Sequence, residues 1–238
     1  MTNLPTLREM LDAGVHFGHK TSRWFPKMAP YIYTSKSGVH IINLEKTEEA
    51  LQKAVEFVRR EAAAGKTFIF VGTKKQTGSI IKEEAGKAGI SYVNIRWLGG
   101  TITNYEAIKG AIKRYKKQVE EIALDDEGKS EMTKSELSRV RKEVARGEKF
   151  LGGLVNMERK PDALILFGSH DEKIALKEAK CDHIPVIALV DTNADPNAVE
   201  YPIPANDDAT KSVRLFASLF AGIIKEARDK VKVVEDKK

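Results

Sequence analysis

The sequence predicts an α/β protein with a doubly wound, mostly parallel sheet of the Rossmann or flavodoxin-like kind, into which an antiparallel coiled-coil helical hairpin is inserted. Two observations support this prediction. From residue 45 onward, short apolar runs alternate with segments of helical spacing, which indicates parallel strands covered on both faces. Near the middle of the chain, a long segment with apolar residues three and four apart interrupts the alternation.

The predicted elements follow one another in a regular order. A helix is expected over residues 45–65, because apolar residues recur at helical spacing until Gly65. A strand, a helix and a strand are expected at 66–72, 74–89 and 90–95. Farther along, a strand, a helix, a strand and a final amphipathic helix are expected at 161–169, 170–180, 184–191 and 208–227.

The segment between these two halves has the pattern of a helical hairpin. Apolar residues lie at 102, 105, 108, 112, 115, 119 and 122, and again at 137, 140, 144, 151 and 154. Joined by the polar turn at 125–130, two such helices should form an antiparallel coiled coil that reaches on the order of 30 Å. We predict an α/β domain from 1–101 and 156–228, a hairpin over 102–155, and a charged, disordered tail over 229–238.

Charge is distributed unevenly along this chain of net charge +6. Lys and Arg outnumber Asp and Glu by 29 to 20 in residues 1–160, are outnumbered by 3 to 10 in residues 161–208, and outnumber them by 8 to 4 in residues 209–238. This polarity favours a protein that turns one face toward a polyanion. A solvated surface of uneven charge is the alternative.

Composition also limits the cellular setting. The first residues include Arg8, Glu9 and Asp12 where a signal peptide needs an apolar run, so a cytoplasmic protein is expected. The one cysteine, Cys181, excludes an internal disulfide and thiolate-rich metal sites. The longest apolar segment is interrupted by Arg214 and is too short for a membrane span.

Residues 15–33 combine two histidines with basic and aromatic side chains. His16 and His19 are followed by Lys20, Arg23 and Lys27 among Trp24, Phe25, Tyr31 and Tyr33. Gly14, Gly18 and Pro26 predict a loop, and no third His or Cys lies nearby, which disfavours a zinc site. Because aromatic rings stack on bases and cations meet phosphates, we interpret this segment as an RNA-contacting extension without metal.

Three further places carry basic residues in positions that suit RNA. The turn at 71–76 leads from strand to helix and contains Lys74 and Lys75, but it lacks the G-x-G-x-x-G of nucleotide cofactor sites. Arg96 ends a strand beside Trp97, which fits a core anchor equally well. On the first predicted helix of the hairpin, Lys109, Lys113 and Lys116 lie at positions i, i+4 and i+7, so they form one basic stripe. The alternative for the turn at 71–76 is a helix start that binds nothing. The alternative for the hairpin lysines is an ordinary solvated helix face.

Four aspartates follow a predicted strand at the end where α/β proteins bind ligands, namely Asp191, Asp195, Asp207 and Asp208. Oxygen ligands suit Mg²⁺. Without a phosphate loop or a general base nearby, we interpret them as loop caps and turn formers, and a divalent ion is the alternative. Ser169 and His170 lack the G-x-S-x-G pattern of a nucleophile, so no catalytic residue, metal or cofactor is expected.

Two enzyme classes compete with this interpretation. A phosphosugar or nucleotide enzyme on a Rossmann-like sheet would need a phosphate loop and a catalytic pair, which the sequence does not offer. A metal-dependent hydrolase would use His16, His19 or the late aspartates. The fold class alone supports neither enzyme.

Three segments together resemble the bacterial small-subunit ribosomal protein S-two family. They are LREMLDAGVHFGH at 7–19, RWLGGTITN at 96–104 and PDALILFGSHDEKIALKEAKCDHIP at 161–185. The resemblance implies about five parallel strands with a coiled-coil hairpin and no catalytic activity. It also implies binding to small-subunit ribosomal RNA between head and body, entry late in assembly, and docking of the S-one protein that recruits messenger RNA.

The expected partners are therefore small-subunit ribosomal RNA and neighbouring ribosomal proteins including the S-one protein, without a membrane or a small-molecule substrate. The resemblance supplies no list of RNA contacts. From charge and placement we infer RNA contacts at Lys20, Arg23, Trp24, Lys27, Lys74, Lys75, Arg96, Lys109, Lys113 and Lys116.

Overall fold

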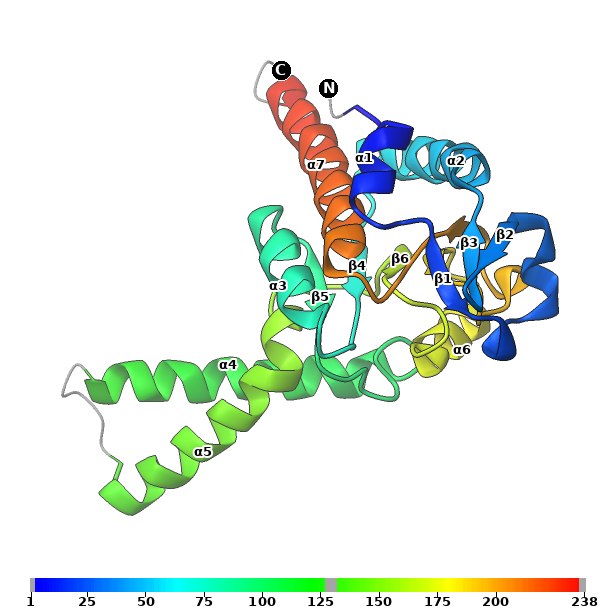
Figure 1. The fold of residues 1–238 in the computed structure, drawn as a ribbon. Coiled ribbons are helices and arrows are strands. Elements are labelled where there is room, and N and C mark those ends of the chain that lie inside the picture. The colour runs from blue at the N-terminus through cyan, green and yellow to red at the C-terminus, as the bar shows by residue number, and fades with distance from the viewer. Residues whose placement is uncertain (1–2, 127–131, 236–238) are drawn as a thin grey trace.

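A five-stranded parallel sheet forms the centre of the computed structural model, which describes residues 3–126 and 132–235 (Figure 1). Its strands are β4 (Phe68–Val71), β5 (Ser91–Val93), β6 (Ala163–Leu166), β7 (Val186–Val190) and β8 (Tyr201–Pro204). They lie in the order β5-β4-β6-β7-β8. Counted along the chain this is the order 2-1-3-4-5, which is typical of flavodoxin-like sheets. The predicted mostly parallel sheet is confirmed.

Successive side chains of a strand point to opposite faces of the sheet. Both faces of this sheet are apolar, and helices cover both. Phe68 and Phe70 belong to one core and Ile69 and Val71 to the other. The first core lies under α1 (Leu7–Asp12), α2 (Leu44–Ala63), α3 (Gly78–Lys87) and α7 (Thr210–Glu235). The second lies under α6 (Lys173–Cys181) and the first turns of α4 (Tyr105–Asp126).

Local chemistry explains where α2 begins and ends. The Asn43 side chain accepts hydrogen bonds from the backbone N–H groups of Glu45 and Lys46, which otherwise lack partners at a helix start. After the last turn, Gly65 adopts a φ of +72°, a conformation that glycine reaches without strain. The predicted helix at 45–65 is therefore confirmed to within two residues.

Residues 15–33, expected as a loop, belong instead to a small antiparallel sheet in the order β1-β3-β2. Its strands are β1 (Phe17–Lys20), β2 (Ile32–Lys36) and β3 (Val39–Ile42), with 3-10 helices η1 (Thr21–Arg23) and η2 (Pro26–Tyr31) between β1 and β2. Positive φ angles at Ser37 and Gly38 allow the tight turn from β2 to β3. The strands are short and their register is irregular, so glycine and proline concealed them in the sequence.

Two other expectations about the C-terminal half need correction. The expected elements include no strand between residues 191 and 208, yet β8 lies there as an edge strand, a position that tolerates Pro202 and Pro204. Helix α7 continues to Glu235, so residues 229–235 of the expected disordered tail are helical, and residues 236–238 lie outside the described chain. That stretch contains no Pro or Gly to end the helix. None of the described helices is long and apolar enough to cross a membrane.

The predicted hairpin corresponds to two long helices, α4 and α5 (Lys134–Leu151), which extend from the domain as an arm and lead through η3 (Gly152–Leu154) back to the sheet (Figure 1). At the base of the arm, Tyr105, Ile108 and Ile112 are buried in the second core. One turn farther out, a Cβ atom on Gly147 would lie 2.6 Å from the Tyr115 ring, so glycine permits a close approach of the helices.

The outer half of the arm is held by polar contacts. Gln118 donates a hydrogen bond to Glu143 over 2.6 Å, and Arg141 pairs with Asp125 over 3.1 Å. Val119, expected in the apolar seam, is 39% exposed. A regular coiled-coil seam therefore stays a prediction, and most of the turn expected at 125–130 lies outside the described residues. The base of the arm, in contrast, is part of the core.

The arm should tolerate shortening but not removal. Replacing residues 117–145 with a short Gly/Ser bridge keeps the Tyr115–Gly147 contact, and we expect a melting temperature within about 5 °C of the intact protein. Replacing 103–155 removes Tyr105, Ile108, Ile112 and Leu154 from the core, at about 2 kcal/mol each, and should leave the chain unfolded. Thermal melting followed by circular dichroism compares the two variants. A folded 103–155 deletion would contradict the assignment of the arm base to the core.

Candidate nucleic-acid interface

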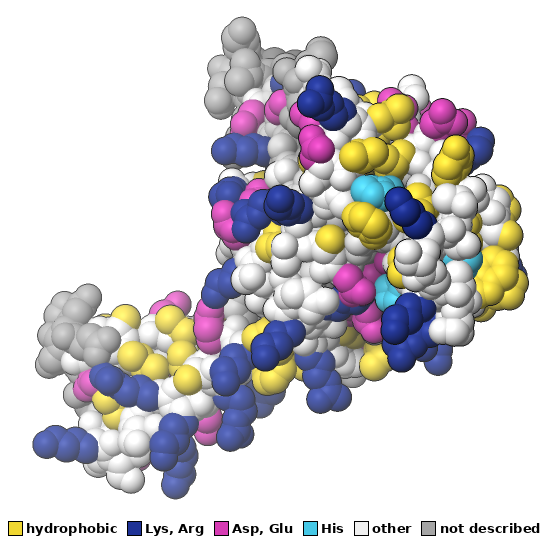
Figure 2. All heavy atoms as spheres, viewed as in Figure 1, with side chains coloured by type: hydrophobic (Ala, Val, Ile, Leu, Met, Phe, Trp, Pro, Cys, Tyr) yellow, Lys and Arg dark blue, Asp and Glu magenta, His cyan; other side chains and the backbone are white. Residues whose placement is uncertain are grey.

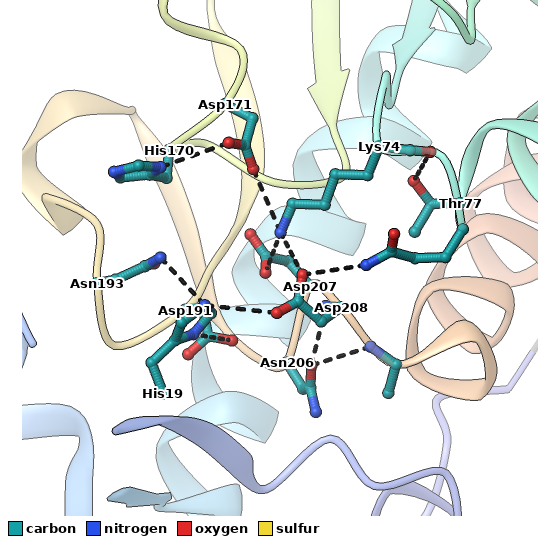
Figure 3. A network of polar contacts seen from close by, with 12 residues as sticks. His19, Lys74, Thr77, His170, Asp171, Asp191, Asn193, Asn206, Asp207 and Asp208 are labelled. Atoms are coloured by element: carbon teal, nitrogen blue, oxygen red, sulfur yellow. Dashed lines mark hydrogen bonds and ion pairs between the residues drawn. The ribbon is translucent and has the colours of Figure 1, made fainter. Parts of the chain in front are cut away.

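Six ionisable side chains meet at the carboxyl edge of the parallel sheet (Figure 3). We call them the sheet-edge cluster, which consists of His19, Lys74, Asp171, Asp191, Asp207 and Asp208. They come from five segments of the chain: the turns after β4, β6 and β7 supply Lys74, Asp171 and Asp191, the turn after β8 supplies Asp207 and Asp208, and β1 supplies His19. In a sheet of this order, the crevice between the first and third strands is where ligands ordinarily bind.

Lys74 lies at the centre of the sheet-edge cluster. Its Nζ lies 2.6 Å from Asp207, 2.7 Å from Asp208 and 3.3 Å from Asp171, and the side chain is only 14% exposed. Although burial opposes the charge, the neighbouring Asp207 and Asp208 carboxylates raise the pKa of Lys74. Lys74, expected as an RNA contact, therefore forms ion pairs with two of the late aspartates, which were interpreted as loop caps and turn formers. Lys74 lines the hollow at this edge, but three carboxylates already surround its ammonium group.

Asp207 is the most deeply buried acid of the sheet-edge cluster. Its carboxylate is fully buried, and its Oδ2 accepts no hydrogen bond from any described residue. Burial, together with the nearby Asp191 and Asp208, raises the pKa of Asp207 to about 7 despite the adjacent Lys74 ammonium group. This carboxyl group consequently depends on Lys74 for compensation of its charge.

His19 attaches the small antiparallel sheet to this edge. Its Nδ1 lies 3.0 Å from Asp191 and its Nε2 lies 3.4 Å from Asp208. The hydrogen bond to Asp191 raises the pKa of His19. The backbone N–H of His19 also donates to the Thr192 hydroxyl over 2.8 Å, while a Cβ atom on Gly18 would come within 2.6 Å of Thr192. Glycine at position 18 is thus required for this close docking.

Four of the expected metal-ligand candidates, His19, Asp191, Asp207 and Asp208, meet in the sheet-edge cluster, whereas Asp195 and His16 lie apart from it. Asp195 lies apart from the other late aspartates and pairs with Lys27 over 2.9 Å. The ring of His16 stacks against Phe17, and burial lowers the pKa of His16, whereas His19 faces Asp191. Within the described ranges, no group of three or more His, Cys, Asp or Glu side chains is arranged to hold a metal ion.

All nine of the other predicted contact residues are on the surface. They are Lys20, Arg23, Trp24, Lys27, Lys75, Arg96, Lys109, Lys113 and Lys116. Arg23 and Lys75 line a hollow of about 710 Å³ above the sheet-edge cluster. Trp24 is 39% exposed and its ring lies 5.3 Å from that of His40. The structure therefore brings Arg23 and Lys75 together but leaves the arm lysines on a separate surface.

Trp97 has the role of a core anchor, and its partner Glu178 is a residue that the sequence did not point out. Trp97 is 4% exposed and donates its indole N–H to Glu178 over 3.0 Å. The same carboxylate accepts backbone N–H bonds from Gly100 and Ile102, which lowers the pKa of Glu178. The sequence signal that could have identified Glu178 is the presence of an acidic residue on the apolar, inward face of α6, where Ala175 also lies.

The fold and this edge define an α/β protein whose ligand crevice is filled by ion pairs among its own side chains. A model of the family described as ribosomal protein S2 matches residues 10–227. The small ribosomal subunit protein uS2 of Coprothermobacter proteolyticus is 47% identical over 94% of this chain and 83% of its own length. That of Synechococcus elongatus is also 47% identical, over 94% and 88%, and that of Oenococcus oeni is 46% identical over 97% and 88%.

The chain belongs to the ribosomal protein S2 family. Its relatives are structural ribosomal proteins, so this chain is a structural constituent of a ribonucleoprotein that serves translation and is not an enzyme. The family resemblance of the three sequence segments is confirmed. The two enzyme hypotheses, based on a phosphate loop or on His16, His19 and the late aspartates, are wrong.

Replacing Lys74 should affect stability far more than replacing its neighbour Lys75. Lys74→Gln leaves Asp207 buried without its cation, which should cost on the order of 3 kcal/mol in the free energy of unfolding. Lys75→Gln is the matched control on an exposed side chain and should be nearly neutral. Urea denaturation measures both, and the double variant Lys74→Gln, Asp207→Asn should recover part of the loss. Equal stability of the two single variants would contradict the central role of Lys74.

The sheet-edge cluster should make the protein less stable at pH 8 than at pH 6. The raised pKa of His19 means that its stabilising charge is fully present below about 6.5 and is lost as the pH rises through the folded-state pKa. Asp207 acts in the same direction, because its raised pKa makes the folded state bind more protons than the unfolded state up to about pH 7. Denaturation at both pH values should show a smaller difference for His19→Gln. A profile unchanged in that variant would disprove the contribution of His19.

Proposed function

We propose that this protein is built into the small ribosomal subunit and binds its ribosomal RNA through exposed cations on two surfaces. The observation that carries this proposal is the contrast between Lys74, which is enclosed by carboxylates, and the lysines of the arm, which are exposed. Cations that are free of internal partners can release counterions when they meet phosphates. Membership of the ribosomal protein S2 family makes ribosomal RNA the fitting polyanion.

The first surface is the arm, for which we retain the antiparallel coiled-coil arrangement of residues 102–155. Lys109, Lys113 and Lys116 share one exposed face of α4, opposite the side that packs against the core and α5. Figure 2 shows Lys and Arg side chains gathered along the arm. Their spacing along the helix suits the backbone of a neighbouring RNA segment, because phosphate contacts position a protein without reading bases.

The second surface surrounds the small antiparallel sheet and the hollow above the sheet-edge cluster. Its proposed contacts are Lys20, Arg23, Trp24, Lys27, Lys75 and Arg96. Lys27 also pairs with Asp195, but both side chains are substantially exposed, and such pairs contribute little. Lys74 is left with a structural role. The two surfaces belong to the proposed division into an α/β domain and an arm.

Finer aspects of the function rest on the family resemblance. We propose that the protein lies between head and body of the subunit in the cytoplasm, joins late in assembly, and helps to dock the S-one protein. Small subunits lacking the chain should regain S-one binding when the purified protein is added back.

The arm stripe should contribute to a salt-dependent affinity for small subunits that lack this protein. Replacing Lys109, Lys113 and Lys116 with Gln removes up to three phosphate contacts. The slope of log affinity against log salt should then fall by about 2 to 3, at roughly 0.7 to 0.9 for each contact. Filter binding at several salt concentrations measures the slope.

The matched control for the stripe replaces Lys53, Lys211 and Lys225, which are also exposed but lie on α2 and α7. This variant has the same net charge as the stripe variant and should keep the slope of the intact protein. Equal slopes in the two variants would mean that the stripe is only solvated surface.

A further inference from the structure

The small antiparallel sheet presents one face to solvent. Residues that lie directly opposite each other on antiparallel strands share a face. The pairing therefore places two rows on this face, Phe17–Ile41–Thr34 and Lys20–Val39–Lys36. The other face is turned toward the domain, since Ile42 is 1% exposed there. We call the two rows the outer face of the small sheet.

An aromatic ring and two cations characterise the outer face. The Phe17 side chain is 49% exposed, so part of its ring is accessible to a partner on this face. The ring of His16 packs against that of Phe17, with the ring centroids 4.0 Å apart and the ring planes tilted by 38°. Burial lowers the pKa of His16, so this ring carries no charge at neutral pH. Lys20 and Lys36 stand in the adjacent row and are both exposed.

The segment that builds the outer face is free of negative charge. No Asp or Glu occurs between Asp12 and Glu45, whereas Lys20, Arg23, Lys27 and Lys36 all fall in this interval. The electrostatic environment of Phe17 is therefore complementary to a polyanion. Figure 2 also shows hydrophobic side chains exposed over α1, where Leu7 and Leu11 are 41% and 55% exposed. Those leucines would suit a protein, but they lie outside the two rows.

We propose that the outer face of the small sheet is a stacking platform for unpaired nucleotides, with Phe17 receiving the base and Lys20 and Lys36 the flanking phosphates. This inference rests on the proposed RNA binding and defines its chemistry at this surface. In a duplex the base faces are already stacked, so an exposed ring can reach only bases of loops, bulges and single strands. Phe17 and Lys36 thereby join the contact residues.

The experiment compares the full chain and its variants on two RNA probes. One is a fluorescein-labelled, unstructured 12-nucleotide RNA with a central 2-aminopurine, and the other is the same strand in a duplex. Phe17→Leu keeps an apolar side chain but removes the ring, and it should weaken single-strand affinity about tenfold by fluorescence anisotropy. Duplex affinity and the salt slope should stay unchanged. Phe17→Tyr should restore binding together with the quenching of 2-aminopurine.

A matched control separates stacking on this face from other effects. Tyr33 is 75% exposed and is skipped by the irregular pairing of β2 with β3, so Tyr33→Leu removes an aromatic ring from the same sheet without changing either row. This variant should bind like the intact protein. Unfolding curves confirm that each variant folds.

The outcomes distinguish this inference from the proposed function. Intact protein that binds the single strand with an affinity insensitive to Phe17→Leu overturns the stacking platform alone. If that variant also fails to enter small subunits, the outer face contacts a protein instead. An equal loss for Tyr33→Leu likewise overturns the assignment to the outer face. Failure of the intact protein to bind any RNA, including subunits that lack it, overturns both proposals.

Discussion

The ion pairs of Lys74 are the interaction on which the rest of the structure depends. Four strands of a parallel sheet end at one edge, and their turns place Asp171, Asp207 and Asp208 within 3.3 Å of one ammonium group. Without it, the fully buried carboxylate of Asp207 would lack a cation and would still lie beside the neighbouring Asp191 and Asp208. Lys74 therefore allows these turns to lie close together. His19 joins the small antiparallel sheet to them through Asp191 and Asp208.

This arrangement separates two uses of positive charge in one basic protein. The lysine that lies where α/β proteins ordinarily bind ligands is used for cohesion, while the cations around it and along the arm remain exposed. At this edge the protein's own side chains supply most of the partners of the converging charges, although Oδ2 of Asp207 accepts no hydrogen bond from a described residue. The surfaces that remain available to partners lie around the hollow, on the small antiparallel sheet and along the arm.

The sequence predicted those parts whose signals are local and repetitive. The strands at β4, β6 and β7 are continuous apolar runs, and the arm helices have sustained helical spacing. The small sheet and β8 escaped prediction because short edge strands with Gly18, Pro202 or Pro204 look like turns. The pairing of Lys74 with Asp207 joins residues 133 apart in the chain, and no periodic pattern encodes such a contact. Exposure of the arm lysines was predictable because they lie opposite the apolar face of α4.

Glu178 has a mechanical consequence for the whole molecule. By holding Trp97, Gly100 and Ile102 in place just before α4 begins, it fixes the direction in which the arm leaves the domain. If both proposed surfaces contact RNA, the protein would bind as a bivalent ligand, in which the first contact raises the effective concentration for the second. Its affinity for an RNA would then depend on the separation of the phosphates as well as on their charge. An RNA whose phosphates lie at the matching separation gains both contacts, whereas an equally charged RNA of another shape gains only one.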